Sequence, residues 1–302
     1  MNIKTVWGVY FSATGTTEKV VKATANALAK LLGAVCELRS FNLPKTRETA
    51  MNFGPEDAVI LGVPVYAGRV PNLLLPYVRD MIHGNGALGI PIVLYGNRNF
   101  DDGLIELRDC MEQNGFHTIA AGAFVGEHSF SRTLGAGRPD AEDMQLADLL
   151  SKRAADWIKA FEAQSRTDAD LQAAQAHEAS GNTDFVWPFA PVCVDGCEPI
   201  RPYYTPRDRH GNPINILKVK PKTDPAKCIH CGLCAAICPM GSIDPTDVSQ
   251  VPGKCIKCCA CVKRCPTGAK YYDDEGYLYH QHELEDVYGE RRAESRIYGL
   301  SL

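Results

Sequence analysis

The sequence of 302 residues has no long hydrophobic run and no large excess of charge of one sign. No stretch offers the about 18 consecutive apolar residues of a membrane-spanning helix, so the sequence excludes such a helix. Lysine plus arginine number 32 and aspartate plus glutamate 36, and the net charge of −4 gives no general signal for nucleic-acid binding. Hydrophobic and charged fractions of 45% and 23% exclude long disordered, collagenous or coiled-coil chains.

A secretory signal is also missing, because the chain enters a strand-like run directly, without a basic segment or a small-residue cleavage site. Cysteine, in contrast, is abundant. Nine of the 13 cysteines lie between Cys228 and Cys265. Such clustering inside a long chain indicates metal or redox chemistry rather than disulfide bonds. We therefore expect a reducing, cytoplasmic setting in which thiolates are available to metal.

Residues 1–165 alternate between short apolar runs and amphipathic segments. The strand-like runs are Thr5–Phe11, Ala34–Leu38, Ala58–Val63, Ile90–Tyr95 and Thr118–Val125. The helical patterns are Thr17–Leu32, Leu73–Met81, Leu104–Asn114 and Ala141–Phe161. Continuously apolar strands between amphipathic helices are typical of a parallel sheet covered on both faces. We predict one doubly wound α/β domain with five parallel strands.

Residues 166–221 are polar and proline-containing, which predicts a connector. Its aromatic residues indicate that it packs on the domains; they are Phe185, Trp187, Phe189, Tyr203 and Tyr204. From Arg201 to Lys222, six basic residues stand against one aspartate, which indicates either a solvated stretch or a docking strip for an acidic partner or the other domain. Residues 276–302 form a polar C-terminal tail to which we assign no role.

Residues 222–275 contain an internal repeat with a constant offset of 27 residues. Each unit reads Cys-x2-Cys-x2-Cys-x3-Cys-Pro, in which three closely spaced thiols converge and the fourth points toward the other unit. A [4Fe-4S] cluster needs four thiolates, so each site borrows its last ligand from the other unit. This assigns Cys228, Cys231, Cys234 and Cys265 to one cluster, and Cys255, Cys258, Cys261 and Cys238 to the second. Zinc knuckles separated by a dozen or more residues fit this spacing poorly.

The cysteine repeat resembles the bacterial-type two-cluster ferredoxins, which implies a small α+β domain over residues 222–275. Cys259, beside a predicted ligand, is interpreted as a buried bystander.

The first strand is followed by a turn rich in hydroxyl groups, Ser12-Ala13-Thr14-Gly15-Thr16-Thr17, which opens a helix. Such donors at a helix N-terminus suit an anion. The turn has no lysine and no Gly-x4-Gly-Lys pattern, which disfavours a nucleoside triphosphate with magnesium. A phosphate monoester fits better, although the turn alone could also be an ordinary helix cap.

Two further loops follow the third and fourth strands, over Pro64–Pro71 and Gly96–Asp102. With a strand order of 2-1-3-4-5, all three loops meet at the carboxyl edge, where ligands bind in such sheets. The combination resembles the flavodoxin family, whose first loop reads Ser/Thr-x-Thr-Gly-x-Thr. The resemblance implies FMN, with its phosphate on Ser12, Thr14, Gly15, Thr16 and Thr17. It places the ring beside Pro64, Val65, Tyr66, Ala67, Gly68, Gly96, Asn97, Arg98 and Phe100.

Four charged or titratable residues near these loops have open roles. Arg69 or Arg98 could bring a positive charge to the ring, or both could be surface arginines. Glu127 and His128, after the fifth strand, could line the site or carry a proton, or could belong to a surface loop. No catalytic residue is assigned.

The whole chain resembles the flavodoxin–ferredoxin fusion proteins of anaerobic bacteria and archaea. The resemblance implies an electron-transfer protein that links one- and two-electron steps and serves redox protein partners, with a homodimer possible. The alternative is an FMN-dependent oxidoreductase that reduces a bound substrate, although no Gly-x-Gly-x-x-Gly fingerprint follows any strand. A redox sensor would need a partner-binding or nucleic-acid element, and none is visible in the sequence.

Overall fold

One mixed sheet forms the centre of the protein. The structure is a computed structural model and describes residues 2–175 and 189–299. The strand order of the sheet is β11-β8-β6-β4-β1-β2, with β7 beside β6. The strands are β1 (Thr5–Tyr10), β2 (Val35–Ser40), β4 (Asp57–Pro64), β6 (Leu88–Tyr95), β7 (His117–Thr118), β8 (Ala121–Val125) and β11 (Arg296–Tyr298).

The predicted flavodoxin-like α/β fold is confirmed for the main strands. Strands β2, β1, β4, β6 and β8 are parallel neighbours in the order expected for the second, first, third, fourth and fifth strands. The predicted count of five strands is wrong, and the order of the whole sheet is not simply 2-1-3-4-5. The predicted fifth strand is interrupted after Thr118, and β11 pairs antiparallel with β8, so that the tail covers what would be an open sheet edge.

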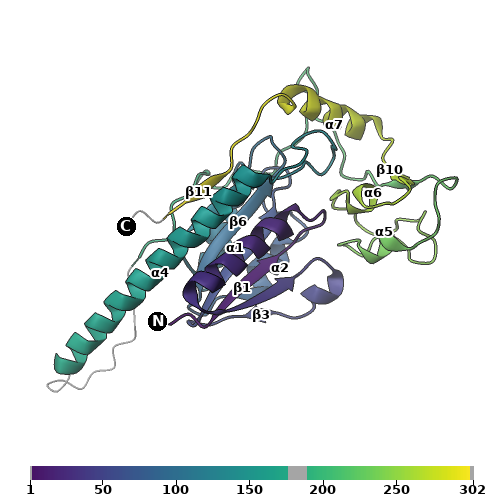
Figure 1. The fold of residues 1–302 in the computed structure, drawn as a ribbon. Coiled ribbons are helices and arrows are strands. Elements are labelled where there is room, and N and C mark those ends of the chain that lie inside the picture. The colour runs from purple at the N-terminus through teal and green to yellow at the C-terminus, as the bar shows by residue number, and fades with distance from the viewer. Residues whose placement is uncertain (1, 176–188, 300–302) are drawn as a thin grey trace.

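Helices cover both faces of this sheet (Figure 1). Helices α1 (Thr16–Leu32) and α4 (Ala141–Gln175) lie on one face, and α2 (Leu75–Met81) and α3 (Gly103–Gln113) on the other. Along β4, Ala58 and Ile60 belong to the core under α1 and α4, whereas Val59 and Leu61 belong to the opposite core. Because both faces are buried, the strands need apolar residues at every position, as the sequence pattern indicated.

The cysteine region lies beyond the carboxyl ends of the strands (Figure 1). It has the small α+β architecture that was predicted, with β9 (Lys222–Thr223) antiparallel to β10 (Lys270–Tyr271) and two short helices, α5 (Leu233–Ala236) and α6 (Ala260–Lys263). Elsewhere, the short strands β3 (Met51–Asn52) and β5 (Ile82–His83) pair with each other. Arg47, in the short helix η1 (Pro44–Arg47), donates a hydrogen bond to the carbonyl of Pro239 in the cysteine region.

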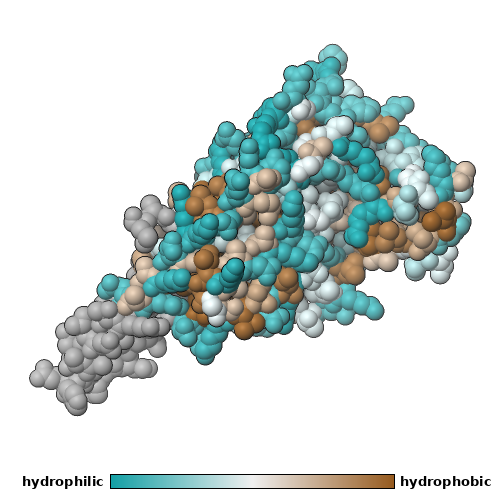
Figure 2. All heavy atoms as spheres, viewed as in Figure 1, coloured by the Kyte–Doolittle hydropathy of each residue, from teal (hydrophilic) through white to brown (hydrophobic). Residues whose placement is uncertain are grey.

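The described part of the connector packs on the rest of the molecule. Phe189 lies 5.3 Å from Trp157 of α4, measured between ring centroids, and the Tyr203 hydroxyl donates to the carbonyl of Val70 at 2.9 Å. Phe185 and Trp187 lie outside the described residues. Among the residues that are described, no helix is both long and apolar enough to cross a membrane. On the face shown in Figure 2, hydrophilic atoms predominate and hydrophobic ones gather in small groups.

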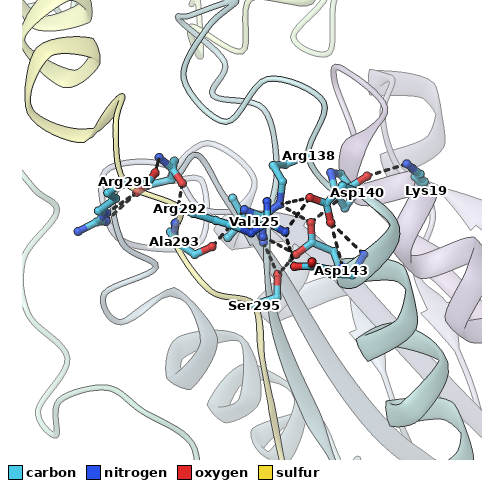
Figure 3. A network of polar contacts seen from close by, with 12 residues as sticks. Lys19, Val125, Arg138, Asp140, Asp143, Arg291, Arg292, Ala293 and Ser295 are labelled. Carbon is cyan, nitrogen blue, oxygen red and sulfur yellow. Dashed lines mark hydrogen bonds and ion pairs between the residues drawn. The ribbon is translucent and has the colours of Figure 1, made fainter.

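The C-terminal tail forms α7 (Glu275–Tyr288) and then returns to the sheet as β11. A buried ion pair fixes this return (Figure 3): Arg138 donates to both carboxylate oxygens of Asp143 at 2.5 Å. Arg138 also donates to the carbonyl of Ala293, and the Ser295 hydroxyl donates to Asp143 at 2.6 Å. The same hydroxyl accepts from the amide of Val125 in β8. The tail and the sheet edge therefore share one polar network.

This network predicts a large stability cost for one substitution. Asp143→Ala should lower the free energy of unfolding by about 3–5 kcal/mol, because it removes the buried carboxylate that accepts both hydrogen bonds from Arg138 and leaves only Asp140, at 3.5 Å, as an ionic partner. The matched control is Glu142→Gln, whose carboxylate is 78% exposed and pairs with the exposed Arg292; its cost should stay below about 1 kcal/mol. Urea unfolding measures both, and equal losses would contradict the assignment.

Candidate functional site

The hydroxyl-rich turn connects β1 to α1 in the conformation that an anion site requires. Gly15 has φ of 103°, a left-handed conformation that suits glycine, and α1 begins at the next residue. The hydroxyl of Ser12 accepts a hydrogen bond from the amide of Glu18 at 3.0 Å and so satisfies one donor in the first turn of α1, whose N-cap residue is Gly15. In the described chain, the amides of Thr14, Gly15 and Thr16 have no hydrogen-bond partner. The helix N-terminus therefore retains donors for a ligand.

The three predicted loops border one cavity of about 1210 Å³. Most residues that the flavodoxin resemblance selected are in its wall: Thr14, Thr16, Thr17, Pro64, Val65, Tyr66, Ala67, Gly68, Gly96 and Arg98. Four of the selected residues are not among the described lining residues: Ser12, Gly15, Asn97 and Phe100. Ser12 and Gly15 shape the turn instead.

Asn97 and Phe100 have structural contacts of their own. The buried Asn97 side chain donates to the carbonyls of Tyr288 and Arg291 at 2.8 and 2.9 Å and accepts from the amide of Ala293. Phe100 is also buried, with its ring centroid 5.4 Å from that of Tyr95. In this structure, the Asn97 side chain thus holds the C-terminal tail, and Phe100 packs under its loop. The flavodoxin resemblance groups both residues with the ligand site, through the loop that carries them.

The loop after β4 is a tight turn whose tip faces the cavity. Tyr66 and Arg69 exchange backbone hydrogen bonds at 2.9 and 3.2 Å, and both intervening residues have positive φ, 52° at Ala67 and 79° at Gly68. This is the pattern of a type I′ turn, which presents its two central residues at the end of a hairpin. A Cβ at Gly68 would lie 2.7 Å from a carboxylate oxygen of Asp101, so the loops after β4 and β6 are in direct contact.

The two arginines near the predicted ring site are each paired with a carboxylate. Arg69 forms an ion pair with Glu106, and Arg98 forms one with Asp101. Arg98 is also in the cavity wall, with its guanidinium 4.6 Å from the ring centroid of Tyr204. Because each positive charge has a negative partner, neither arginine is a free cation beside the cavity.

Glu127 and His128 are also in the cavity wall, where both contact the cysteine region. Lys263 of α6 donates to a carboxylate oxygen of Glu127 at 2.5 Å and to the carbonyl of His128 at 2.6 Å. Burial, together with the charge of Lys263, lowers the pKa of His128 to about 3. His128 is therefore neutral near pH 7 and poorly suited to carry a proton there.

Several lining residues come from segments that the sequence did not connect with the site. They belong to the connector, to α7 and to the second cysteine unit, and include Tyr203, Tyr204, His280, Lys254, Cys255 and Lys257. The aromatic and basic character of the connector was the only sequence signal for this part of the wall.

Two smaller cavities in the cysteine region separate the predicted ligand sets. One is lined by Cys228, Cys231, Cys234 and Cys265, and the other by Cys238, Cys255, Cys258 and Cys261 together with Cys259. Each cavity thus combines three thiols of one unit with the fourth of the other. No three His, Cys, Asp or Glu side chains in the described ranges converge on a single metal ion. The thiols that hold a four-iron cluster need not converge on one ion, since each thiolate binds a different iron.

The two units repeat their backbone contacts to sulfur. The amide of Ser242 donates to Cys238 Sγ at 3.3 Å, and that of Ala269, 27 residues later, donates to Cys265 Sγ at 3.2 Å. Burial raises the pKa of the Cys258 and Cys261 thiols, and a bound cation would favour their thiolate form. This donor set fits an iron–sulfur cluster.

Cys259 occupies the position that Gly232 has in the first unit. Both residues are left-handed, with φ of 58° and 70°. The Cys259 sulfur lies 3.2 Å from the Tyr277 hydroxyl, and burial raises the pKa of its thiol to about 12. Cys259 is therefore a protonated thiol that contacts a tyrosine, in keeping with its interpretation as a bystander.

Comparison with known proteins gives two kinds of match. Residues 220–243 and 248–271 each match a family described as a 4Fe-4S binding domain. No curated protein matches the chain. Similar solved structures include a flavodoxin from the domain Archaea (15% identity, 52% of this chain and 99% of that one, TM-score 0.34). A second is a flavodoxin of Streptococcus pneumonia TIGR4 (16% identity, 49% of this chain and 95% of that one, TM-score 0.35). A third is rubredoxin oxygen:oxidoreductase from the anaerobe Desulfovibrio gigas (16% identity, 53% of this chain and 37% of that one, TM-score 0.38).

The two family matches cover the two cysteine units in order, each with its three closely spaced cysteines. The C-terminal region of this chain therefore carries two 4Fe-4S binding domains.

Proposed function

We propose that this chain is an electron-transfer protein that moves low-potential electrons between two [4Fe-4S] clusters and an FMN. The observation that carries the proposal is a single cavity whose wall contains both the hydroxyl-rich turn, with Thr14 and Thr16, and Cys255 of the second cysteine unit. An FMN bound there would accept one or two electrons, whereas each cluster exchanges one at a time. The chain would thus link one- and two-electron steps.

The residues of the large cavity fit FMN. Thr14, Thr16 and Thr17 supply neutral hydroxyls beside unpaired amides and the positive end of the α1 dipole, which suits a phosphate monoester. The turn at Tyr66–Arg69 and the loop at Gly96–Arg98 border the part of the cavity proposed for the ring. Ligand pockets commonly measure about 300–1,000 Å³, so this cavity is large enough for the whole cofactor.

The cysteine cavities fit the crossed ligand sets. We assign Cys228, Cys231, Cys234 and Cys265 to one cluster, and Cys255, Cys258, Cys261 and Cys238 to the other. The support is that the first four cysteines line one small cavity, and that the second four line another, together with Cys259.

An FMN-dependent oxidoreductase is the second candidate, favoured by the size of the cavity, which exceeds the usual volume for one ligand. Two observations weigh against it. Glu127 is engaged by Lys263, and burial lowers the pKa of His128 to about 3, which leaves His128 poorly suited to protonate a substrate near neutral pH. We therefore favour a carrier that serves redox protein partners in a reducing, cytoplasmic setting.

The basic connector makes hydrogen bonds to the cysteine region of the same chain, which leaves fewer of its groups for a partner protein. The amino group of Lys220 donates to the carbonyls of Val251 and Pro252, and that of Lys257 donates to the carbonyl of Leu217. These contacts join the connector to the cysteine region, which supports docking of the other domain over docking of an acidic partner.

Anaerobic purification followed by analysis and stopped-flow reduction tests the function. We expect about eight iron atoms and one FMN per chain, with a spectrum that bleaches stepwise under dithionite. NADH and NADPH should reduce the protein slowly compared with a low-potential one-electron donor. Rapid reduction by either nucleotide, or turnover of an organic acceptor, would reject the carrier in favour of the oxidoreductase.

The crossed ligation predicts which variants share a phenotype. Cys265→Ala should lose the same cluster, with the same remaining EPR spectrum, as Cys231→Ala, although Cys265 lies in the other cysteine unit. Cys259→Ser is the matched control and should retain iron at the wild-type level. If the spectrum of Cys265→Ala matched that of Cys258→Ala instead, each unit would hold its own cluster.

The phosphate site predicts a ranking of flavin affinities. Thr14→Ala should weaken FMN binding roughly tenfold to a hundredfold, the effect of losing a hydrogen bond to a charged group. Arg98→Ala should weaken it less, because Arg98 is already paired with Asp101. Titration of the flavin-free protein with FMN measures both constants, and equal losses would reject the ranking.

A further inference from the structure

The large cavity and one of the two cysteine cavities share part of their walls. Cys255 and Ile256 line both the large cavity and the cavity around Cys238, Cys258 and Cys261. No described residue lines both the large cavity and the one around Cys228, Cys231, Cys234 and Cys265. Only one of the predicted clusters therefore adjoins the proposed flavin site.

Resting on the proposed function, we infer that the cluster held by Cys238, Cys255, Cys258 and Cys261 is the direct electron partner of the flavin. Cys255 is the ligand at the contact, and the Tyr272 hydroxyl adjusts the potential of this cluster. The other cluster then exchanges electrons with the flavin only through this one.

Packing places the second cysteine unit against the α/β domain. Cys258 and Ala260 are buried in the same core as Phe11 and Val63, next to the partly buried Tyr66 and Ile256. Cys228 and Cys234 pack in a small separate core with Ile243 and Val248, which they share with Cys238 and Cys261 but which has no residue in common with the core of the α/β domain. The unit that carries Cys255 thus continues the core of the domain that forms the proposed flavin site.

The ion pair between Lys263 and Glu127 fixes this unit in place. Lys263 lies between Cys261 and Cys265 in the sequence, and its side chain is only 9% exposed. Its contacts with Glu127 and the His128 carbonyl join α6 directly to the loop that borders the large cavity. A shielded pair with a second hydrogen bond constrains the orientation of α6 more than an exposed pair would.

A different hydroxyl lies beside a ligand sulfur of each predicted cluster: that of Tyr272 beside Cys255 in one, and that of Thr267, 3.7 Å from Cys265 Sγ, in the other. The Tyr272 hydroxyl oxygen lies 3.6 Å from Cys255 Sγ, and the Tyr272 ring stacks on Tyr277 with centroids 4.2 Å apart. Tyr277 in turn packs against Phe130, which is in the wall of the large cavity. The residue 27 positions before Tyr272 is Pro245, which has no hydroxyl to offer. A hydrogen bond to a ligating sulfur stabilises the reduced cluster and raises its potential.

The electron step itself is simple. A cluster held by Cys238, Cys255, Cys258 and Cys261 would give up one electron and return to its oxidised state, and a flavin bound beside Cys255 would gain that electron. Two such transfers would reduce a bound flavin by two electrons, and an external one-electron reductant, generated photochemically in the kinetic experiment, would restore the clusters. Since electron transfer slows steeply with distance, the cluster that adjoins the cavity is the one that exchanges directly.

Tyr272→Phe tests the potential, with Tyr271→Phe as the matched control because Tyr271 is 39% exposed. In a redox titration followed by EPR, Tyr272→Phe should lower the equilibrium constant for reduction of one cluster by up to about tenfold. This corresponds to a reduction potential up to about 59 mV lower for a one-electron step. The affected signal should be the one that Cys258→Ala removes and Cys231→Ala retains. A shift in the other signal, no shift, or an equal shift in Tyr271→Phe would overturn the role of Tyr272.

A kinetic measurement tests the electron partner. A light pulse on an added photosensitiser, with a sacrificial electron donor, generates the one-electron reductant that reduces the clusters. Electron arrival at the flavin should then persist in Cys231→Ala and be lost in Cys258→Ala, with FMN and about four iron atoms present in both. The reverse pattern would overturn the inference and leave the proposed function intact. A wild-type chain that binds no FMN or no iron would instead reject the proposed function.

Discussion

The position of the cysteine region depends on the return of the chain to its own sheet. After α4 the backbone leaves the α/β domain, passes through the connector and the cysteine units, and comes back as β11 beside β8. The Arg138–Asp143 ion pair and the amide of Asn97 hold this return at the carboxyl edge of the strands. Both ends of the cysteine-bearing segment are therefore anchored to one domain, and the segment covers the edge at which parallel sheets bind ligands.

Three basic side chains in or near the wall of the large cavity are paired with carboxylates, and four lysines, Lys218, Lys220, Lys254 and Lys257, add positive charge to the same wall. Arg69 faces Glu106, Arg98 faces Asp101, and Lys263 faces Glu127. The proposed phosphate position has only hydroxyls, amides and a helix dipole. A cofactor held in this way would keep its affinity over a wide range of salt, because dipoles next to the ligand are less screened than distant charges on the surface.

Local patterns in the sequence predicted the parts of the structure that local physics determines. The apolar runs gave β1, β4 and β6 to within two residues at either end, because both sheet faces are buried. The cysteine spacing predicted the two sets of four that line separate cavities, because three thiols at such short spacing share one loop. Gly15 lies in the first turn, as predicted, because the left-handed conformation at the start of α1 suits glycine.

Contacts between distant segments could not be read in this way. β11 has three residues and no alternating pattern, so its pairing with β8 depends on the polar network around Asp143. Asn97 was assigned to the ligand loop from its position, whereas its amide bonds to residues almost 200 positions later. The α7 residues in the cavity wall, such as His280, were missed because the polar tail gave no sign of packing there.

The anchoring of the cysteine region at both ends has a consequence for kinetics. Two groups on separate proteins meet at a rate set by the concentrations of both, and two groups on a flexible tether meet at a rate set by its length. Here the connector, α6 and β11 hold the second cysteine unit against the cavity in a single arrangement. Any exchange between groups bound at the two places would therefore be a first-order event, equally fast in dilute and in concentrated solution.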